Sequence, residues 1–217
     1  MFANREEAGN LLAEKLINYS NNTEAVIVTI PRGGVPVGSV MAKKLHLPLE
    51  IVLSKKIGHP FNKEYAIGAV TLKNRILSDS VPGVSKLYIE EETERVRAIL
   101  KQRYQLYYNT KKPLELKNKI VILVDDGVAT GNTLISSFEL IQLQKPSSII
   151  VALPVASPSA LNNIKKLPNV FITICLLAPR DFRAVGQFYE EFNQVSDTEV
   201  INLLKEVNDN FQFSYTK

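Results

Sequence analysis

Short apolar runs alternate with segments of helical character along most of the chain, and this alternation limits the folds open to it. The runs are rich in β-branched residues: Ala25–Ile30, Leu49–Leu53, Lys119–Val124, Ser148–Pro154 and Val170–Leu177. Runs without regular polar residues are typical of strands that helices cover on both faces. The sequence therefore predicts an α/β fold, with a mainly parallel central sheet flanked by helices.

Between these runs, apolar residues recur at helical spacing. The predicted helices are Arg5–Tyr19, Val35–Leu45, Asn132–Leu143, Pro158–Lys166 and Asp197–Val207. Ser196–Glu199 has the Ser-x-x-Glu form of a capping box, which places the start of the last helix. The middle of the chain is less regular. There we expect Ala66–Leu72 and Arg75–Asp79 to pair as a hairpin, and Ser85–Tyr108 to form a charged helix.

The composition is that of a globular protein and excludes several classes. The chain has 217 residues, 45% of them hydrophobic and 22% charged, which fits one domain. Its net charge of +4 is too small and too spread out to require a nucleic-acid partner. We see neither a signal peptide in Met1–Glu14 nor an apolar stretch long enough to span a membrane. The single cysteine, Cys175, excludes an intramolecular disulfide and fits a cytoplasmic protein.

Two adjacent carboxylates directly follow one of the apolar runs. The segment Val121–Thr133 reads VILVDDGVATGNT, so Asp125 and Asp126 emerge together at the carboxyl end of a buried strand. Neighbouring acids repel each other unless a cation or hydroxyl donors hold them. In open parallel sheets, ligands bind beyond the carboxyl ends of the strands. The pair therefore indicates a site for hydroxyl groups, because the alternative, a helix-capping turn, needs only one short polar residue.

The turn after these acids has the features of a phosphate cradle. Its glycines permit close backbone approach, and its hydroxyl and amide groups open onto the start of a helix. The residues that we expect to bind there are Gly127, Ala129, Thr130, Gly131, Asn132 and Thr133. Acids and turn together predict a ligand with vicinal hydroxyls and a phosphomonoester, spaced as in ribose 5-phosphate. The P-loop and Rossmann motifs are both absent from the sequence.

Val121–Thr133 resembles the phosphoribosyl-pyrophosphate (PRPP) signature of the type I phosphoribosyltransferases. In that family, the two acids bind the ribose 2′- and 3′-hydroxyls and the following loop binds the 5′-phosphate. The resemblance implies the same roles for Asp125, Asp126 and the turn at Ala129–Thr133. It also implies a small hood built from both ends of the chain. We therefore expect a single domain, 1–217, with a core at about 21–178 and a hood at about 1–20 and 179–217.

A second loop, Pro31-Arg32-Gly33-Gly34, follows the first apolar run. Arg32 offers a fork of donors beside the exposed backbone of Gly33 and Gly34, which suits a diphosphate. A tight turn with a solvated arginine is the alternative. The family resemblance implies that this loop holds the pyrophosphate, and that in some relatives it contains a cis non-proline peptide.

Two lysines, Lys55 and Lys56, end the second run and are expected at the same rim of the sheet. Adjacent residues of a strand point to opposite faces, so only one of them is expected to reach a ligand. The resemblance implies a pyrophosphate contact at Lys55, but the sequence leaves the choice between the two open. The family also closes a mobile loop over its site, and the candidate lid here is 58–77, extended by the charged helix at 90–103.

The resemblance implies transfer of a 5-phosphoribosyl group from PRPP to a nucleobase or related heterocycle, with release of pyrophosphate. Asp125, Asp126 and Arg32 would be the catalytic residues, and Mg²⁺ the cofactor. The two acids would contact the metal partly through water. One alternative is a non-catalytic module of the same fold that senses PRPP or a nucleotide. Another is a hydrolase that acts on a ribose phosphate.

The acceptor is the least constrained part of this hypothesis. Ala129 stands where the 6-oxopurine branch of the family carries a further Asp, which counts against a hypoxanthine-guanine role. In the hood, Phe182 and Tyr189 could stack on a base or simply pack. Across the chain, motifs from Arg-x-x-Ala-Gly at Arg5 to Tyr-x-x-Phe-x-Gln-x-Ser-Asp at Tyr189 resemble a bacterial subgroup of predicted phosphoribosyltransferases with no assigned acceptor. A homodimer is the family's expectation.

Overall fold

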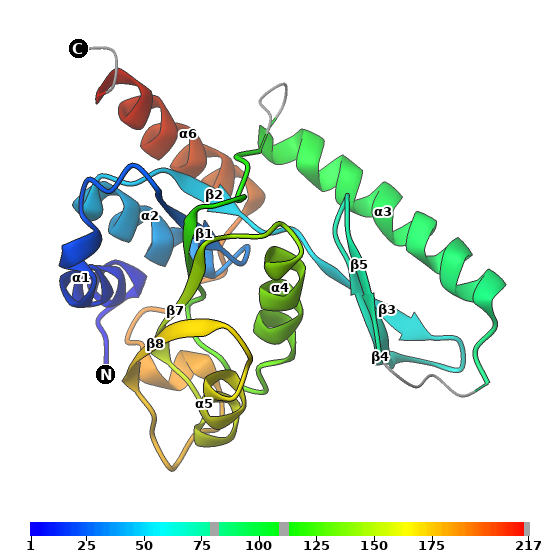
Figure 1. Cartoon of the computed structure of the whole chain (residues 1–217). Helices are drawn as coiled ribbons and strands as arrows, with labels where there is room; N and C mark the ends of the chain where they lie inside the picture. Colours follow the sequence, from blue (N-terminus) through cyan, green and yellow to red (C-terminus); the bar gives the residue numbers. More distant parts are fainter. Residues whose placement is uncertain (79–82, 109–112, 215–217) are drawn as a thin grey trace.

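The centre of the molecule is a parallel five-stranded sheet with the strand order β2-β1-β6-β7-β8. The computed structural model describes residues 1–78, 83–108 and 113–214. The strands of the sheet are β1 (Ala25–Thr29), β2 (Leu49–Ile51), β6 (Ile120–Val124), β7 (Ser148–Val155) and β8 (Val170–Leu177). Each predicted apolar run supplies one of these strands (Figure 1), so the predicted α/β fold is confirmed.

Helices cover both faces of this sheet. On one face lie α1 (Arg5–Lys15), α2 (Gly34–Leu45) and α6 (Asp197–Ser214), and on the other α4 (Asn132–Gln142) and α5 (Pro158–Lys165). Within β6, Ile122 and Val124 belong to the hydrophobic core that includes residues of α1, α2 and α6. Val121 and Leu123 belong to the core that includes residues of α4 and α5. Burial on both faces explains why these strands read as continuous apolar runs.

A three-stranded antiparallel sheet and a long helix form an arm, which Figure 1 shows beside α4. The elements of the arm are β3 (Lys55–His59), β4 (Asn62–Val70), β5 (Arg75–Leu77) and α3 (Lys86–Tyr108). The predicted hairpin corresponds to β4 and β5, although Asp79 lies outside the described residues. The sequence does not predict β3, because this strand carries a single apolar side chain, Ile57.

The two ends of the chain lie against each other. The Phe2 amide donates to the Phe188 carbonyl at 2.8 Å, and the Glu190 amide donates back to the Phe2 carbonyl at 2.8 Å. The 3₁₀ helix η2 (Val185–Phe188) ends at this contact. The division into core and hood stays a prediction, but these bonds join the two segments assigned to the hood.

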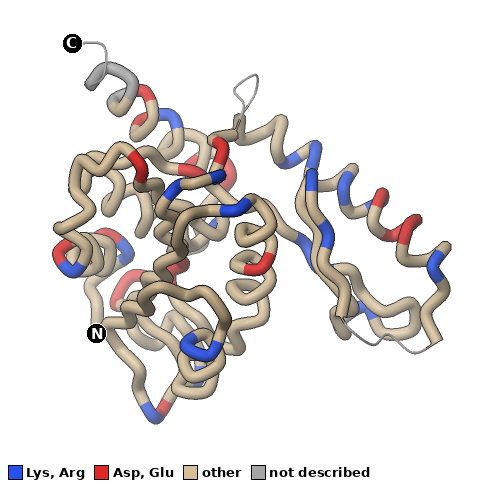
Figure 2. Tube along the Cα trace, viewed as in Figure 1, with Lys and Arg blue, Asp and Glu red and all other residues tan. Residues whose placement is uncertain are grey.

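The remaining differences from the predicted helices lie at their ends. The first predicted helix is divided into α1 and a 3₁₀ turn, η1 (Ile17–Tyr19), and α6 continues past Val207 to Ser214. The Ser196 hydroxyl accepts the Glu199 amide at 3.1 Å, as the capping box predicts. Within the described ranges, no helix is both long and apolar enough to cross a membrane. Basic and acidic residues are interspersed along the described trace (Figure 2).

Candidate active site

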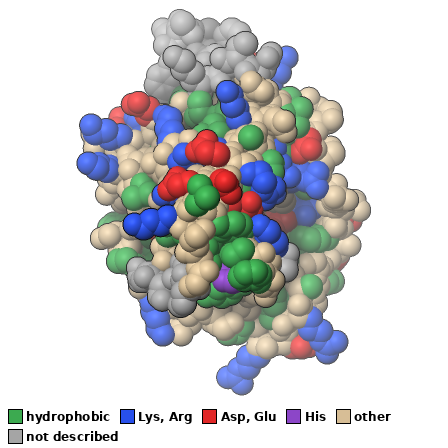
Figure 3. Space-filling view, turned by 90° about the vertical axis from the view of Figure 1, so that its right-hand side faces the viewer, with side chains coloured by type: hydrophobic (Ala, Val, Ile, Leu, Met, Phe, Trp, Pro, Cys, Tyr) green, Lys and Arg blue, Asp and Glu red, His purple; other side chains and the backbone are tan. Residues whose placement is uncertain are grey.

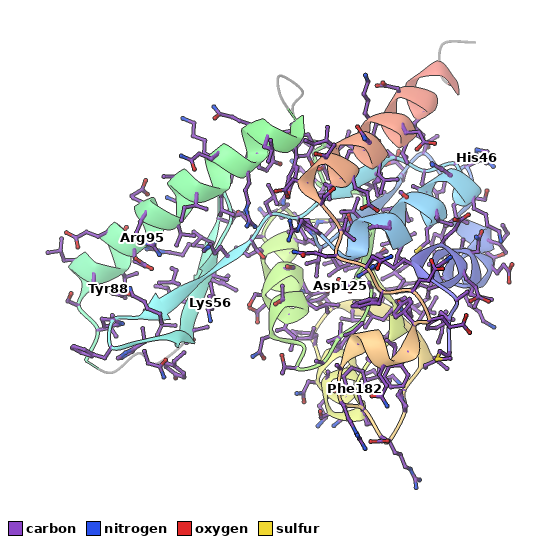
Figure 4. All side chains as sticks on the ribbon, turned by 180° about the vertical axis from the view of Figure 1, so that it is seen from behind. His46, Lys56, Tyr88, Arg95, Asp125 and Phe182 are labelled. Carbon is purple, nitrogen blue, oxygen red and sulfur yellow. The ribbon has the colours of Figure 1, made fainter. Side chains whose placement is uncertain are left out.

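The acid pair lies where β6 ends, within the core of the molecule (Figure 4). Asp126 is 9% exposed, and its amide donates to Asp125 Oδ1 at 2.9 Å. Burial raises the pKa of Asp125 well above its usual value, and the neighbouring Asp126 carboxylate raises it further. Burial also raises the pKa of Asp126, while the Arg5 guanidinium opposes that rise. Two shielded acids that repel each other favour a ligand-binding role over a structural turn.

The loop between β1 and α2 lies directly against these acids. A Cβ atom on Gly33 would lie 2.1 Å from Asp126 Oδ2, and one on Gly34 would lie 3.0 Å from the Asp125 Cα. Because a Cβ at Gly33 would clash with Asp126 and one at Gly34 would crowd Asp125, the two glycines allow the loop to touch the acid pair. The Pro31–Arg32 peptide bond is cis. The structure therefore brings together the two loops that the sequence predicts for diphosphate and ribose.

Arg32 lies on the open side of this loop. Its Nη1 atom is 3.9 Å from Asp197 Oδ1 at the start of α6, and the two side chains are 39% and 46% exposed. Asp197 also accepts a hydrogen bond from the Tyr107 hydroxyl of α3. Burial raises the pKa of Tyr107 to about 12, so this hydroxyl keeps its proton at neutral pH. An exposed ion pair of this length is weak, and an anionic ligand can replace Asp197 beside Arg32.

The turn predicted to bind phosphate leads into α4. Gly131 is the N-cap residue of α4 and has a φ of 87°, in the left-handed region that favours glycine. Since glycine has no side chain to cap the helix, the amides of the first turn are left for other partners. The Ser157 hydroxyl supports the turn by donating to the Ala129 carbonyl at 2.6 Å. The exposed residues of the turn are Ala129, Thr130, Asn132 and Thr133.

Residues from both ends of the chain contact the acid pair. Arg5 Nη2 of α1 lies 2.8 Å from Asp126 Oδ2, and the Tyr189 hydroxyl donates to the Asp126 carbonyl at 2.6 Å. A Cβ atom on Gly127 would lie 2.4 Å from Val185 Cγ1, so η2 packs on the turn as well. Sequence reasoning assigns Arg5 no role and leaves open whether Tyr189 stacks on a base or simply packs. The motifs that contain Arg5 and Tyr189 are visible in the sequence, but nothing in the sequence indicates that both residues contact Asp126.

Most of the chain, residues 3–188, matches the family described as the phosphoribosyl transferase domain. The matched part includes the acid pair, the Pro31–Gly34 loop and the phosphate turn. The chain belongs to the phosphoribosyl transferase domain family. Together with the fold, this membership confirms the resemblance to the type I phosphoribosyltransferases.

Two curated proteins of Mycobacterium tuberculosis, from strains CDC 1551 and H37Rv, carry names that assign them provisionally to the phosphoribosyl transferases. Each is 32% identical to this chain over 215 residues, which is 97% of this chain and 48% of the relative. The chain therefore spans about half the length of these curated phosphoribosyl transferase relatives.

Two solved structures share the fold of this chain. The protein TT1426 from Thermus thermophilus is 36% identical and has a TM-score of 0.84, covering 94% of this chain and 98% of its own. A Neisseria gonorrhoeae protein solved with bound ppGpp is 14% identical, with a TM-score of 0.52 and coverage of 93% and 92%. At that identity the second likeness shows a shared fold and nothing more.

The two lysines that the sequence expects at the rim lie on β3 of the arm. Lys55 pairs with Val70 and Lys56 with Ala69 of β4, and both lysines are exposed. Figure 4 shows Lys56 well apart from Asp125. The expectation that the second strand ends at these lysines is wrong, because the chain leaves the parallel sheet after Ile51 and enters the arm. A pyrophosphate contact for either lysine stays a prediction.

The candidate lid, 58–77, forms most of the antiparallel sheet of the arm. Near its tip, the His59 ring lies 5.8 Å from Phe61 and 6.0 Å from Tyr65, measured between ring centroids. Phe61 is 89% exposed. Figure 3 shows hydrophobic side chains beside a histidine on this side of the molecule. Closure of this lid over the candidate site stays a prediction.

The acid pair suits a magnesium ion held with help from a ligand. In the described part of the chain, no group of three His, Cys, Asp or Glu side chains could hold a metal by itself. Mg²⁺ commonly binds proteins through one or two carboxylates and takes its other oxygens from water and substrate phosphates. The carboxylates of Asp125 and Asp126 fit that pattern.

Proposed function

We propose that this chain is a phosphoribosyltransferase that uses PRPP and Mg²⁺ to phosphoribosylate a nucleobase or related heterocycle and releases pyrophosphate. The contact between Gly33 and Asp126 carries the proposal. In PRPP the diphosphate is attached to C1′, beside the 2′-hydroxyl. A site for this molecule therefore needs a diphosphate loop against a hydroxyl-binding acid, and a Cβ at Gly33 would lie only 2.1 Å from Asp126 Oδ2.

Each part of PRPP has a matching part of the site. Asp125 and Asp126 would accept hydrogen bonds from the ribose hydroxyls. The amides at the start of α4, in the turn at 129–133, would bind the 5′-phosphate. Arg32, with the backbone of Gly33 and Gly34, would bind the pyrophosphate.

In the reaction, a ring nitrogen of the acceptor forms a bond to C1′ while the bond from C1′ to the diphosphate oxygen breaks. The electron pair of that bond leaves with pyrophosphate. Positive charge develops on the ribose ring, where Asp125 and Asp126 lie close, and negative charge develops on the leaving group beside Arg32. When bound, Mg²⁺ would neutralise part of the diphosphate charge.

The test combines PRPP binding with pyrophosphate release across a panel of heterocycles, both in the presence of Mg²⁺. Replacing both acids, Asp125→Asn with Asp126→Asn, should weaken PRPP binding by roughly 100-fold or more, because each lost charged hydrogen bond is worth about 1.5–3 kcal/mol. The matched control, Glu14→Gln with Glu24→Gln, also removes two charges, from exposed ion pairs with Lys44 and Lys119.

Wild-type turnover by an acceptor, lost in the acid variant and kept in the control, supports the proposal. Unchanged PRPP binding in the acid variant would show that the site is misassigned. PRPP binding without turnover across the whole panel would favour the sensing module. Ribose 5-phosphate formed without any acceptor would favour the hydrolase.

Two finer parts of the proposal rest on the family resemblance and the composition. These are a homodimeric assembly and a cytoplasmic location. Light scattering of the purified protein tests the first, because a monomer at micromolar concentration would contradict it. Fractionation of the source cells tests the second.

A further inference from the structure

Two motifs from opposite ends of the chain, Arg-x-x-Ala-Gly at Arg5 and Tyr-x-x-Phe-x-Gln-x-Ser-Asp at Tyr189, meet at Asp126. Arg5 donates from Nε to Asp126 Oδ2 at 2.9 Å, and its Nη2 atom lies 2.8 Å from the same oxygen in an ion pair. The two side chains are only 12% and 13% exposed. A shielded, hydrogen-bonded ion pair of this kind is unlike the exposed ion pairs found elsewhere on the surface.

The rest of the Arg5 guanidinium is held by the second motif. Its Nη1 atom donates to the Asn193 carbonyl at 2.8 Å. Its Cζ atom lies 3.9 Å from the centroid of the Phe192 ring, over which the guanidinium is placed. Arg5 is therefore fixed from two sides before any ligand arrives.

The backbone of α1 is built to bring Arg5 to this place. The Asn4 side chain caps the helix by accepting the Glu7 amide at 3.0 Å, which makes Arg5 its first residue. A Cβ atom on Gly9 would lie 2.7 Å from the Val37 carbonyl, so the glycine lets α1 pack closely on α2. Since α2 begins at Gly34, the last residue of the diphosphate loop, the helix on which α1 packs is the same helix that continues from this loop.

Tyr189 holds the same aspartate through its backbone. Its hydroxyl donates to the Asp126 carbonyl at 2.6 Å, and its ring stacks on Phe192 at 5.0 Å and contacts Phe2 at 5.3 Å. The side chain and the main chain of Asp126 are thus each held by a residue from a different end of the chain.

We propose that Arg5 is a positioning residue for the ribose site, which orients the Asp126 carboxylate toward the sugar. The guanidinium contacts only Oδ2 of Asp126, so the ribose hydroxyl would approach the carboxylate from its Oδ1 side. Lysine keeps the charge but lacks the planar guanidinium that donates to both Asp126 and the Asn193 carbonyl and lies over Phe192. The inference rests on the proposed function, because the ribose contact of Asp126 is part of that proposal.

The test separates sugar binding from diphosphate binding. Ribose 5-phosphate, inorganic pyrophosphate and PRPP are titrated calorimetrically, with Mg²⁺ present, into the wild type, Arg5→Gln and Arg5→Lys. We expect Arg5→Gln to weaken ribose 5-phosphate and PRPP by roughly 10- to 100-fold, as for a lost charged hydrogen bond. Inorganic pyrophosphate, which contacts the Arg32 loop, should change less than about threefold. Arg5→Lys should fall between wild type and Arg5→Gln for the sugar ligands.

The control is Lys44→Gln, which removes a 3.0 Å ion pair between α2 and Glu14 of α1 without touching Asp126. It should leave all three affinities unchanged. Thermal unfolding of each variant shows whether it is folded. If Arg5→Gln does not fold, Arg5→Lys must show the selective weakening of the sugar ligands relative to pyrophosphate.

The possible results point in different directions. Selective loss of the sugar ligands supports the positioning role. Unchanged or tighter ribose 5-phosphate binding overturns it, since Arg5 would then make no contribution to sugar binding or would oppose it. Equal weakening of ribose 5-phosphate and pyrophosphate also overturns it, because that pattern indicates general disruption. Failure of the wild type to bind any sugar ligand would instead overturn the proposed function itself.

Discussion

At the scale of single residues, the site depends on the missing side chain of Gly33. Its φ of −60° and ψ of −34° suit any residue, so the conformation of the backbone does not require glycine. The requirement comes from space, because Asp126 Oδ2 occupies the position that a Cβ would need. The contact places the loop against the acid pair, and binding of a diphosphate by this loop stays a prediction.

Gly33→Ala should therefore separate the loop from the acid pair. We expect pyrophosphate and PRPP to bind at least about tenfold more weakly, since a displacement of about 1 Å at a positioned site is costly. Calorimetric titration measures both affinities. The control is Gly83→Ala, which lies outside the loop and the candidate lid and whose added Cβ would have nothing within 4 Å. Unchanged pyrophosphate binding in Gly33→Ala would contradict the assigned role of the loop.

At the scale of elements, ionic and polar contacts join α3 to the hairpin of the arm. Glu92, 7% exposed, accepts two 2.7 Å hydrogen bonds from Arg95 and lies 3.6 Å from Lys63 of β4. The Tyr88 hydroxyl donates to the Gly58 carbonyl of β3 at 2.7 Å. Hydrogen bonding with Arg95 lowers the pKa of Glu92, which keeps it charged at neutral pH. Tyr88, Arg95 and Lys56 lie together on the arm in Figure 4, so helix and hairpin are expected to move as one element.

Glu92→Gln should loosen the hairpin without affecting the core. Loss of the charge should raise hydrogen exchange of β3 and β4 amides by about tenfold, equivalent to about 1.4 kcal/mol of local stability. Amides of β6 should keep their protection, as measured by mass spectrometry. Glu94→Gln is the control, because Glu94 pairs with Arg97 on the same helix and is 68% exposed. Equal exchange in the two variants would mean that Glu92 does not hold the arm.

At the scale of the whole molecule, Glu50 ties β2 to the segment between α3 and β6. Its side chain accepts the Ile51 amide at 2.8 Å and, across 64 residues of chain, the Leu114 amide at 2.7 Å. Glu50 is 4% exposed. Burial raises its pKa from 4.5 to about 7, against the opposing effect of the two backbone hydrogen bonds. The folded protein therefore binds a proton at Glu50 that the unfolded chain has released.

This difference makes stability depend on pH. Between 4.5 and about 7, Glu50 is neutral when folded and charged when unfolded, so its contribution to the free energy of unfolding falls as pH rises. The full loss is at most about 3 kcal/mol, complete above the folded pKa. Urea unfolding from about pH 5 to about pH 8 should show a smaller decline in Glu50→Gln than in the wild type. Parallel curves for the two proteins would contradict this role.

Much of the architecture could be predicted because buried positions carry apolar residues, and these can be recognised in the sequence. Strands such as β6 and β7 are covered on both faces, so they read as apolar runs. The arm leaves a weaker trace. Lys55 and Lys56 of β3 are exposed, and only the pairing with β4 shows that they belong to a strand. Antiparallel pairing of a half-exposed strand depends on its neighbours more than on its own residues.

The sequence by itself determined the chemical groups of the site: two acids after a buried strand, a glycine turn before a helix, and an arginine beside two glycines. These are local patterns, and each follows from a single segment. Only the tertiary structure decided that Asp126 is held by Arg5, 121 residues away, and that Arg32 faces Asp197. Such contacts depend on how helices from both ends of the chain pack on the sheet. Residue type and spacing show which groups can bind each other, but the fold alone sets the distance between them.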